Sequence, residues 1–157
     1  MAHIHRLIGK AMRLWWKLRR PLTLGVRAIV VDDRDRVALV RHSYVDGWYL
    51  PGGGVKGGES IVAAIVRELR EEIGLEDAPI ERVIGVHHSR KEGKDDHVVT
   101  FLVRVDADRA AGLRGADATE IAEMGWFAID APPPGATPAT LRRIADYRAG
   151  AQGLGIW

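Results

Sequence analysis

The chain has 157 residues, of which 46% are hydrophobic and 28% are charged, and it contains no cysteine. This length and composition predict one compact globular domain, and the lack of cysteine excludes disulfides and thiolate metal sites. The formal net charge of +2 is too small to indicate a nucleic-acid partner.

Basic and apolar residues alternate at helical spacing in residues 3–20. The pattern predicts a basic amphipathic helix within residues 1–21, ended by Pro21, in front of a domain over 22–157. Such a helix is compatible with peripheral membrane contact, with packing on the domain, and with pairing to its copy in a homodimer. The apolar runs here are too short for a secretory signal or a membrane span, so we expect a cytoplasmic protein.

Two strand-like runs follow, residues 23–31 and 37–40, with the polar turn Asp32–Asp35 between them. Together they predict a β-hairpin. A short aromatic strand at residues 48–50 is expected to lead into Pro51 and a glycine-rich loop.

The next predicted element is a helix that Ser60 caps and that runs to about Ile73, with Gly74 as its C-terminal stop. Residues 80–88 and 97–105 predict two more strands.

The remaining chain predicts a loop over residues 106–123, a last strand at 126–129, a proline linker at 132–134 and a terminal helix at 140–148. The series of elements predicts an α/β fold, in which helices cover a mixed β-sheet in an α/β/α sandwich.

Three glutamates share one side of the helix predicted after Ser60. Glu68, Glu71 and Glu72 are spaced i, i+3 and i+4, and they occupy an arc of about 100° beside the apolar stripe. Each pair of like charges costs about 0.2–0.5 kcal/mol even on an exposed helix. The cluster therefore favours a bound cation, and the alternative is a solvated charged face.

Oxygen-only ligands indicate Mg²⁺, with Mn²⁺ as a substitute. The preceding loop contains glycines at positions 52, 53, 54, 57 and 58, which allow the backbone to approach a ligand closely. A backbone carbonyl of Gly52 or Gly53 could complete the metal shell. A glycine loop followed by a carboxylate helix indicates a site for metal-bound phosphates.

Residues 53–75 match the signature of the Nudix family, G-x5-E-x7-R-E-U-x-E-E-x-G-U with U aliphatic, without a departure. The chain therefore resembles Nudix hydrolases. This resemblance implies a Nudix-like sandwich and Mg²⁺-dependent hydrolysis of a diphosphate linkage. The substrate would be a small molecule: a nucleoside diphosphate linked to another moiety, as in nucleotide sugars and ADP-ribose, or a nucleoside triphosphate. The alternative is a catalytically silent Nudix-fold module that binds nucleotides for regulation.

The resemblance also implies roles for single residues. Glu68, Glu71 and Glu72 match the metal-binding glutamates of the family, and Glu68 or Glu71 would also be the general base. Glu59 and Arg67 match residues that brace the loop and orient the catalytic glutamates.

Further site residues lie outside the carboxylate cluster. Many family members add a metal-binding glutamate from a later loop, a role that fits Glu120, with Glu123 as its rival. The candidates for substrate contact are two glycines of the loop, an arginine at a strand end and an aromatic residue: Gly52, Gly54, Arg41 and Trp48. Arg41 could equally be a surface residue, and Trp48 a core residue.

Overall fold

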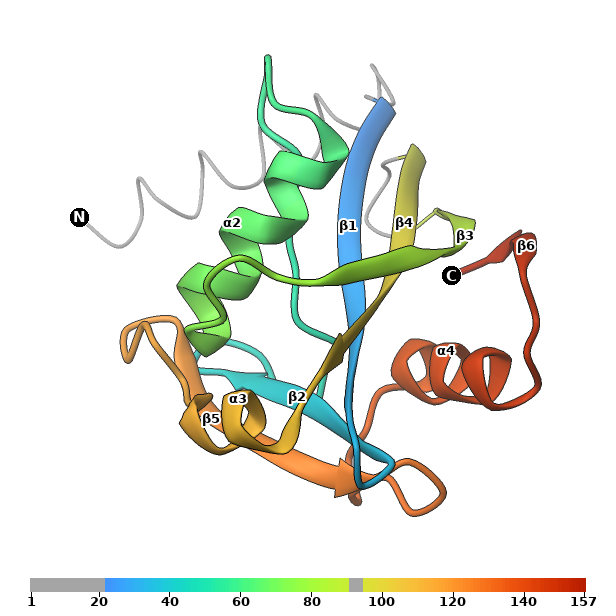
Figure 1. Cartoon of the computed structure of the whole chain (residues 1–157). Helices are drawn as coiled ribbons and strands as arrows, with labels where there is room; N and C mark the ends of the chain where they lie inside the picture. The colour runs from blue at the N-terminus through green and yellow to red at the C-terminus, as the bar shows by residue number, and fades with distance from the viewer. Residues whose placement is uncertain (1–21, 91–94) are drawn as a thin grey trace.

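A mixed six-stranded sheet forms the centre of the protein (Figure 1). The computed structural model describes residues 22–90 and 95–157, so the helix predicted within residues 1–21 lies outside the described residues. The strands, in the sheet order β5-β2-β1-β4-β3-β6, are β5 (Ile121–Ala128), β2 (Arg36–His42), β1 (Leu22–Asp32), β4 (Asp95–Val105), β3 (Ile80–Ser89) and β6 (Gly153–Ile156).

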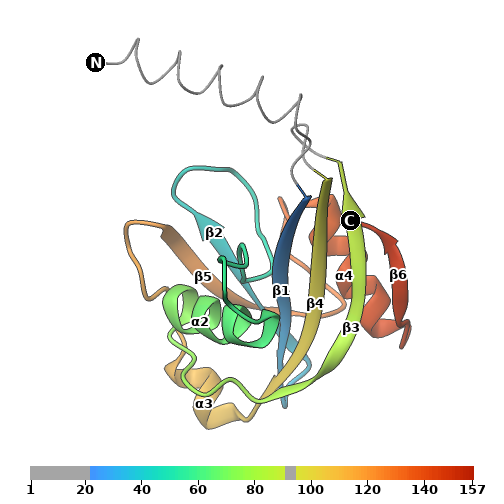
Figure 2. The same ribbon diagram turned by 90° about the horizontal axis from the view of Figure 1, so that it is seen from above.

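Helices lie on both faces of this sheet (Figure 2). They are α2 (Ile61–Ile73) and α3 (Ala107–Gly112) on one face and α4 (Pro138–Arg148) on the other. Side chains of β1 alternate between the two cores: Val26 and Ala28 pack with α2, whereas Ile29 packs with Ile144 of α4. The α/β arrangement with a mixed sheet is therefore confirmed.

Strands β1 and β2 form the predicted hairpin and then separate (Figure 1). Their antiparallel pairing is recorded at Val31 and Val37, while β1 pairs in parallel with β4 along its whole length. The segment 49–55 fills the space that opens between them. Its backbone bonds to β2 through Tyr49 and to β1 through Pro51 and the residues after it. This split in the sheet fixes the glycine-rich loop.

Helix α2 begins and ends where the sequence predicts. The Ser60 side chain accepts a hydrogen bond from the Ala63 amide at 3.0 Å. At the other end Gly74 has a φ of 70°, the left-handed conformation that glycine adopts without strain. The fully buried residues Ile65 and Leu69 anchor the helix to the sheet and so fix which face carries the glutamates.

Three predictions need correction, and one strand has no counterpart among the predicted elements. The loop over residues 106–123 is wrong, since it contains α3, which Asp106 caps, and the first residues of β5. The strand at 48–50 is replaced by isolated bridges. The last strand begins at Ile121 instead of residue 126. The short strand β6 was not predicted at all. Among the described helices, none combines the length and the hydropathy of a membrane-spanning segment.

Candidate active site

The glycine-rich loop contacts β1 so closely that a side chain at Gly52 would not fit. A Cβ atom there would lie 2.2 Å from the Val26 carbonyl oxygen, and Gly52 has a φ of 134°. The next residue, Gly53, accepts a 2.8 Å hydrogen bond from the Val26 amide through its carbonyl oxygen. A Cβ atom at Gly53 would lie 2.5 Å from Oε1 of Glu68. The two glycines therefore bring the loop against helix α2.

Glu72 is the buried carboxylate of the site, with only 4% of its surface exposed. Its Oε2 accepts a 2.8 Å hydrogen bond from the Gly52 amide. Burial raises the pKa of Glu72 to about 7, even though the Gly52 hydrogen bond and the charge of Arg27 lower it. His42 lies 3.9 Å away, but burial lowers the pKa of His42, so this pair is not a salt bridge at neutral pH.

Arg67 donates hydrogen bonds to the other three carboxylates of the signature, Glu59, Glu68 and Glu71. Its guanidinium donates to both oxygens of Glu59, at 2.8 and 3.0 Å. The same side chain donates to Glu68 at 2.7 Å and to Glu71 at 3.1 Å. The hydrogen bonds from Arg67 lower the pKa of Glu59 to about 2 and raise the pKa of Arg67 itself. A fifth hydrogen bond reaches the Gly54 carbonyl and ties the helix to the loop.

The donor set fits a hard divalent cation. It contains oxygen atoms only, from three carboxylates and the Gly53 carbonyl, which is the chemistry that Mg²⁺ and Mn²⁺ prefer. Glu72 supports this fit, because burial disfavours its ionised form and a cation bound beside it would favour that form. Within residues 22–90 and 95–157 no three acidic or histidine side chains already form a metal-sized cluster. The Arg67 hydrogen bonds hold Glu68 and Glu71 in their present orientation.

The two later glutamates have different surroundings. Glu120 is exposed; it lies 3.4 Å from the Tyr44 hydroxyl, and its negative charge contributes to the raised pKa of Glu72. Glu123 instead forms an ion pair with Arg41 on the neighbouring strand β2. Of these two glutamates, Glu120 is therefore the one whose charge acts on a carboxylate of helix α2.

Two predicted substrate contacts have little support from their positions. Trp48 is 8% exposed and packs edge-on against Phe127 in the core beside α4. The guanidinium of Arg41 is held by Glu123 and lies 5.4 Å from the centre of the Trp48 ring. The loop residue Gly54, in contrast, is exposed and lines a cleft.

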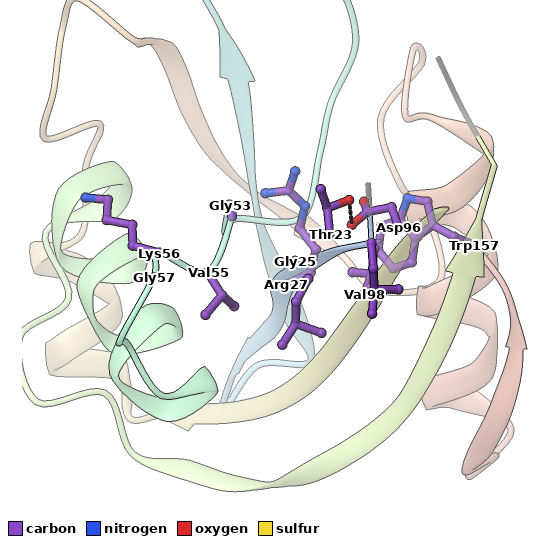
Figure 3. Close-up of a pocket in the computed structure, with 13 residues that line it drawn as sticks. Thr23, Gly25, Arg27, Gly53, Val55, Lys56, Gly57, Asp96, Val98 and Trp157 are labelled. Carbon is purple, nitrogen blue, oxygen red and sulfur yellow. Dashed lines mark hydrogen bonds between the residues drawn. The ribbon is translucent and has the colours of Figure 1, made fainter. Parts of the chain in front are cut away.

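This cleft, of about 550 Å³, opens directly beside the glycine-rich loop (Figure 3). Lys56 and Gly57 lie at one end of the labelled residues and Trp157 at the other, with Gly53, Arg27 and the Thr23–Asp96 pair between them. The Nη1 atom of Arg27 is buried and has no hydrogen-bond partner within the described part of the chain. Arg27 and Trp157 also line a second cavity of about 450 Å³ beside α4.

Sequence reasoning missed Arg27, Asp96 and Trp157. Arg27 interrupts an apolar strand, which is the one signal that could have drawn attention to it. Asp96 and Trp157 line the same cleft only because β4 pairs with β1 and β6 pairs with β3.

Known proteins resemble this chain in sequence and in fold. The Nudix domain model matches residues 21–147. A "Putative 8-oxo-dGTP diphosphatase" of Bacillus subtilis (strain 168) is 34% identical over 134 residues, 85% of this chain and 85% of that protein. An RNA pyrophosphohydrolase of Legionella pneumophila (strain Corby) is 45% identical over 58 residues, which cover 37% of this chain and 33% of the relative.

Two solved structures share the fold. The MutT Nudix hydrolase from Burkholderia pseudomallei superimposes with a TM-score of 0.64 and 27% identity, over 80% of this chain and 97% of that one. A Nudix hydrolase from Nitrosomonas europaea gives a TM-score of 0.68 and 30% identity, over 85% and 93% of the two chains. The signature, the carboxylate helix and these likenesses agree, and the chain thus belongs to the Nudix family and is a hydrolase of diphosphate linkages.

Proposed function

We propose that this hydrolase acts on nucleoside triphosphates and releases diphosphate from them. The observation that carries the proposal is the cleft of about 550 Å³, because Gly53 and Gly54 line it and also bond to the strand and helix of the carboxylate site. A cleft of this size suits a nucleoside. A nucleotide lying in it would place its phosphates beside the glutamates. The Bacillus relative, named for a triphosphate substrate, matches over most of both chains.

In this proposal the metal ion would be held by Glu68, Glu71 and Glu72, with Glu120 and the Gly53 carbonyl as further ligands. When bound, a divalent ion neutralises phosphate charge and lowers the pKa of a coordinated water. Gly52 keeps Glu72 in place through its amide, and Glu59 keeps Arg67 in place.

Two further tasks, transfer of a proton from the attacking water and positioning of the phosphates, would be carried out by side chains of this chain. Glu68 or Glu71 would accept the proton of the attacking water as the general base. Arg27 lines the cleft and would bind a non-bridging phosphate oxygen through its guanidinium, whose Nη1 has no hydrogen-bond partner among the described residues. Water attacks phosphorus, the linkage between the α- and β-phosphates breaks, and the products are a nucleoside monophosphate and diphosphate.

A substrate panel tests the proposal. It contains dGTP, 8-oxo-dGTP, dATP, ADP-ribose and UDP-glucose, each assayed with Mg²⁺ and with Mn²⁺, and mass spectrometry identifies the products. We expect monophosphate and diphosphate from the triphosphates, with kcat/KM at least tenfold above that for the two sugar-linked substrates. The reverse order would assign the enzyme to nucleotide sugars or ADP-ribose.

Two variants separate catalysis from the alternative of a silent nucleotide-binding module. We expect Glu71→Gln to lower kcat at least a hundredfold while the fold is kept, because the site loses a metal-binding charge. Glu76→Gln is the matched control, since Glu76 is exposed just beyond α2. Nucleotide binding without metal-dependent turnover by the unmodified chain would support the silent module.

A further inference from the structure

Asp96 presents a carboxylate to the cleft at the end remote from the carboxylate helix (Figure 3). It lies on β4 in register with Thr23 of the parallel strand β1. The Thr23 hydroxyl donates a 2.9 Å hydrogen bond to Oδ1 of Asp96 and so fixes the orientation of the carboxylate. The neighbouring Asp95 is different, because it bonds to His88 and Arg90 and does not line the cleft.

Within residues 22–90 and 95–157, no hydrogen bond or ion pair reaches the second carboxylate oxygen of Asp96, Oδ2, whereas Oδ1 is bonded to Thr23. The floor beside it is Gly25, where even an added Cβ would stay 3.9 Å from Oδ2. The missing side chain at Gly25 leaves room for a flat group to approach the carboxylate edge-on.

Trp157 provides a flat apolar wall close to Asp96. Its amide donates a 2.9 Å hydrogen bond to the His88 carbonyl, which attaches it to the end of β3. The Arg143 guanidinium lies 5.5 Å from the centre of its ring. The indole is held in place while it still lines the cleft, and this geometry suits stacking on a nucleobase.

We propose that Asp96 selects the base of the substrate by accepting two adjacent N–H groups from it, while the base stacks on Trp157. The base is then of the guanine type. This inference rests on the proposed function, since it places the nucleoside in the same cleft.

The hydrogen-bonding edges of the bases explain the choice. An ionised carboxylate only accepts hydrogen bonds, so it pairs best with an edge that presents donors alone. Guanine presents its ring N–H and its amino group side by side, and oxidation at C8 leaves that edge unchanged. Adenine and cytosine present one amino donor beside a ring acceptor, which would face a carboxylate oxygen unfavourably.

Binding of monophosphates to the full chain tests this inference without turnover. Isothermal titration calorimetry would compare dGMP with dIMP, which lacks the amino group, and with dAMP. We expect dGMP to bind at least tenfold more tightly than either, since each lost hydrogen bond to a charged group costs about 1.5–3 kcal/mol, or roughly 10- to 150-fold. Equal affinities for the three ligands would overturn the inference.

Variants then locate the selectivity. Asp96→Asn presents one acceptor and one donor, so the preference for dGMP should fall at least tenfold and binding of dAMP should improve relative to it. Thr23→Val removes the positioning hydroxyl and should reduce the preference by a smaller factor. Asp95→Asn is the matched control and should keep the full preference for dGMP. A full preference for dGMP in Asp96→Asn would contradict the assignment.

The two proposals fail in different ways. If dGMP is preferred through Asp96 but no triphosphate is hydrolysed, the base selection stands and the proposed function is wrong. If triphosphates are hydrolysed with equal kcat/KM for guanine and adenine bases, the base selection is wrong and the proposed function stands.

Discussion

The amide of Gly52 donates a 2.8 Å hydrogen bond to Oε2 of Glu72, and this contact joins the glycine-rich loop to helix α2. The two residues are 20 positions apart in the sequence, and the loop reaches Glu72 only because it lies in the split between β1 and β2. The position of the Glu72 carboxylate therefore depends on a residue at which a side chain would not fit.

Gly52→Ala should damage both stability and catalysis. Its Cβ atom would lie 2.2 Å from the Val26 carbonyl oxygen, and its φ of 134° is strained for alanine. We expect the free energy of unfolding to fall by about 1–3 kcal/mol and kcat to fall at least tenfold, as measured by urea denaturation and initial rates. The control is Gly112→Ala at the end of α3, where an added Cβ meets no atom within 4 Å. A Gly52→Ala enzyme with unchanged kcat would show that the Glu72 contact is dispensable.

Glu120→Gln should slow catalysis more than Glu123→Gln. The charge of Glu120 acts on Glu72, whereas Glu123 is occupied by its ion pair with Arg41. We expect kcat to fall at least tenfold for the first variant and less than threefold for the second, with a higher Mg²⁺ requirement for the first only. The two substitutions are matched in chemistry and lie on the same segment of chain. The opposite order of effects would make Glu123 the later metal ligand.

The sequence predicts helix α2 well because its signals are local. Ser60 and Gly74 cap it through contacts within a few residues, and the apolar stripe determines which face is buried. The glutamates then follow from helical geometry alone. The hairpin of β1 and β2 is local in the same way.

Elements that depend on distant partners could not be predicted in this way. The strand β6 has two glycines in four residues and forms by pairing with β3. Helix α3 spans only six residues, too short for a clear periodic pattern. The contact of Asp96 with Thr23 depends on the register of β4 with β1, which the sequence of β4 alone does not reveal.

The ion pair of Glu59 with Arg67 should stabilise the protein down to unusually low pH. The pKa of Glu59 is about 2 in the folded protein, below its ordinary value of 4.5. A lowered pKa of an acid means that the stabilisation is complete above pH 4.5 and is lost as the pH falls towards 2. We expect Glu59→Gln to lower the urea midpoint equally at pH 7 and pH 5, and by less at pH 3. If the difference between the two urea midpoints stays constant down to pH 2.5, the ion pair does not cause that difference.

The contribution of Glu72 to stability should change with pH in the opposite direction, because burial raises the pKa of Glu72 to about 7. The folded protein then binds a proton at Glu72 more tightly than the unfolded chain does. Stability is therefore lost as the pH rises from 4.5 through 7, and the whole penalty is present above pH 7. A shift from 4.5 to about 7 corresponds to a penalty on the order of 3 kcal/mol.

Glu72→Gln should thus stabilise the metal-free protein at pH 8 while it lowers kcat at least a hundredfold. The glutamine side chain keeps an oxygen that can accept the Gly52 hydrogen bond, but it carries no buried charge. We expect thermal unfolding with EDTA to show a higher Tm for the variant at pH 8 and equal values at pH 4.5. Added Mg²⁺ and nucleotide should raise the Tm of the unmodified chain and shift the variant less, since a ligand stabilises the state that binds it. If the variant is instead less stable than the unmodified chain at pH 8 without metal, a positive group of the protein itself already stabilises the ionised Glu72 carboxylate. A bound cation is then not needed for that purpose.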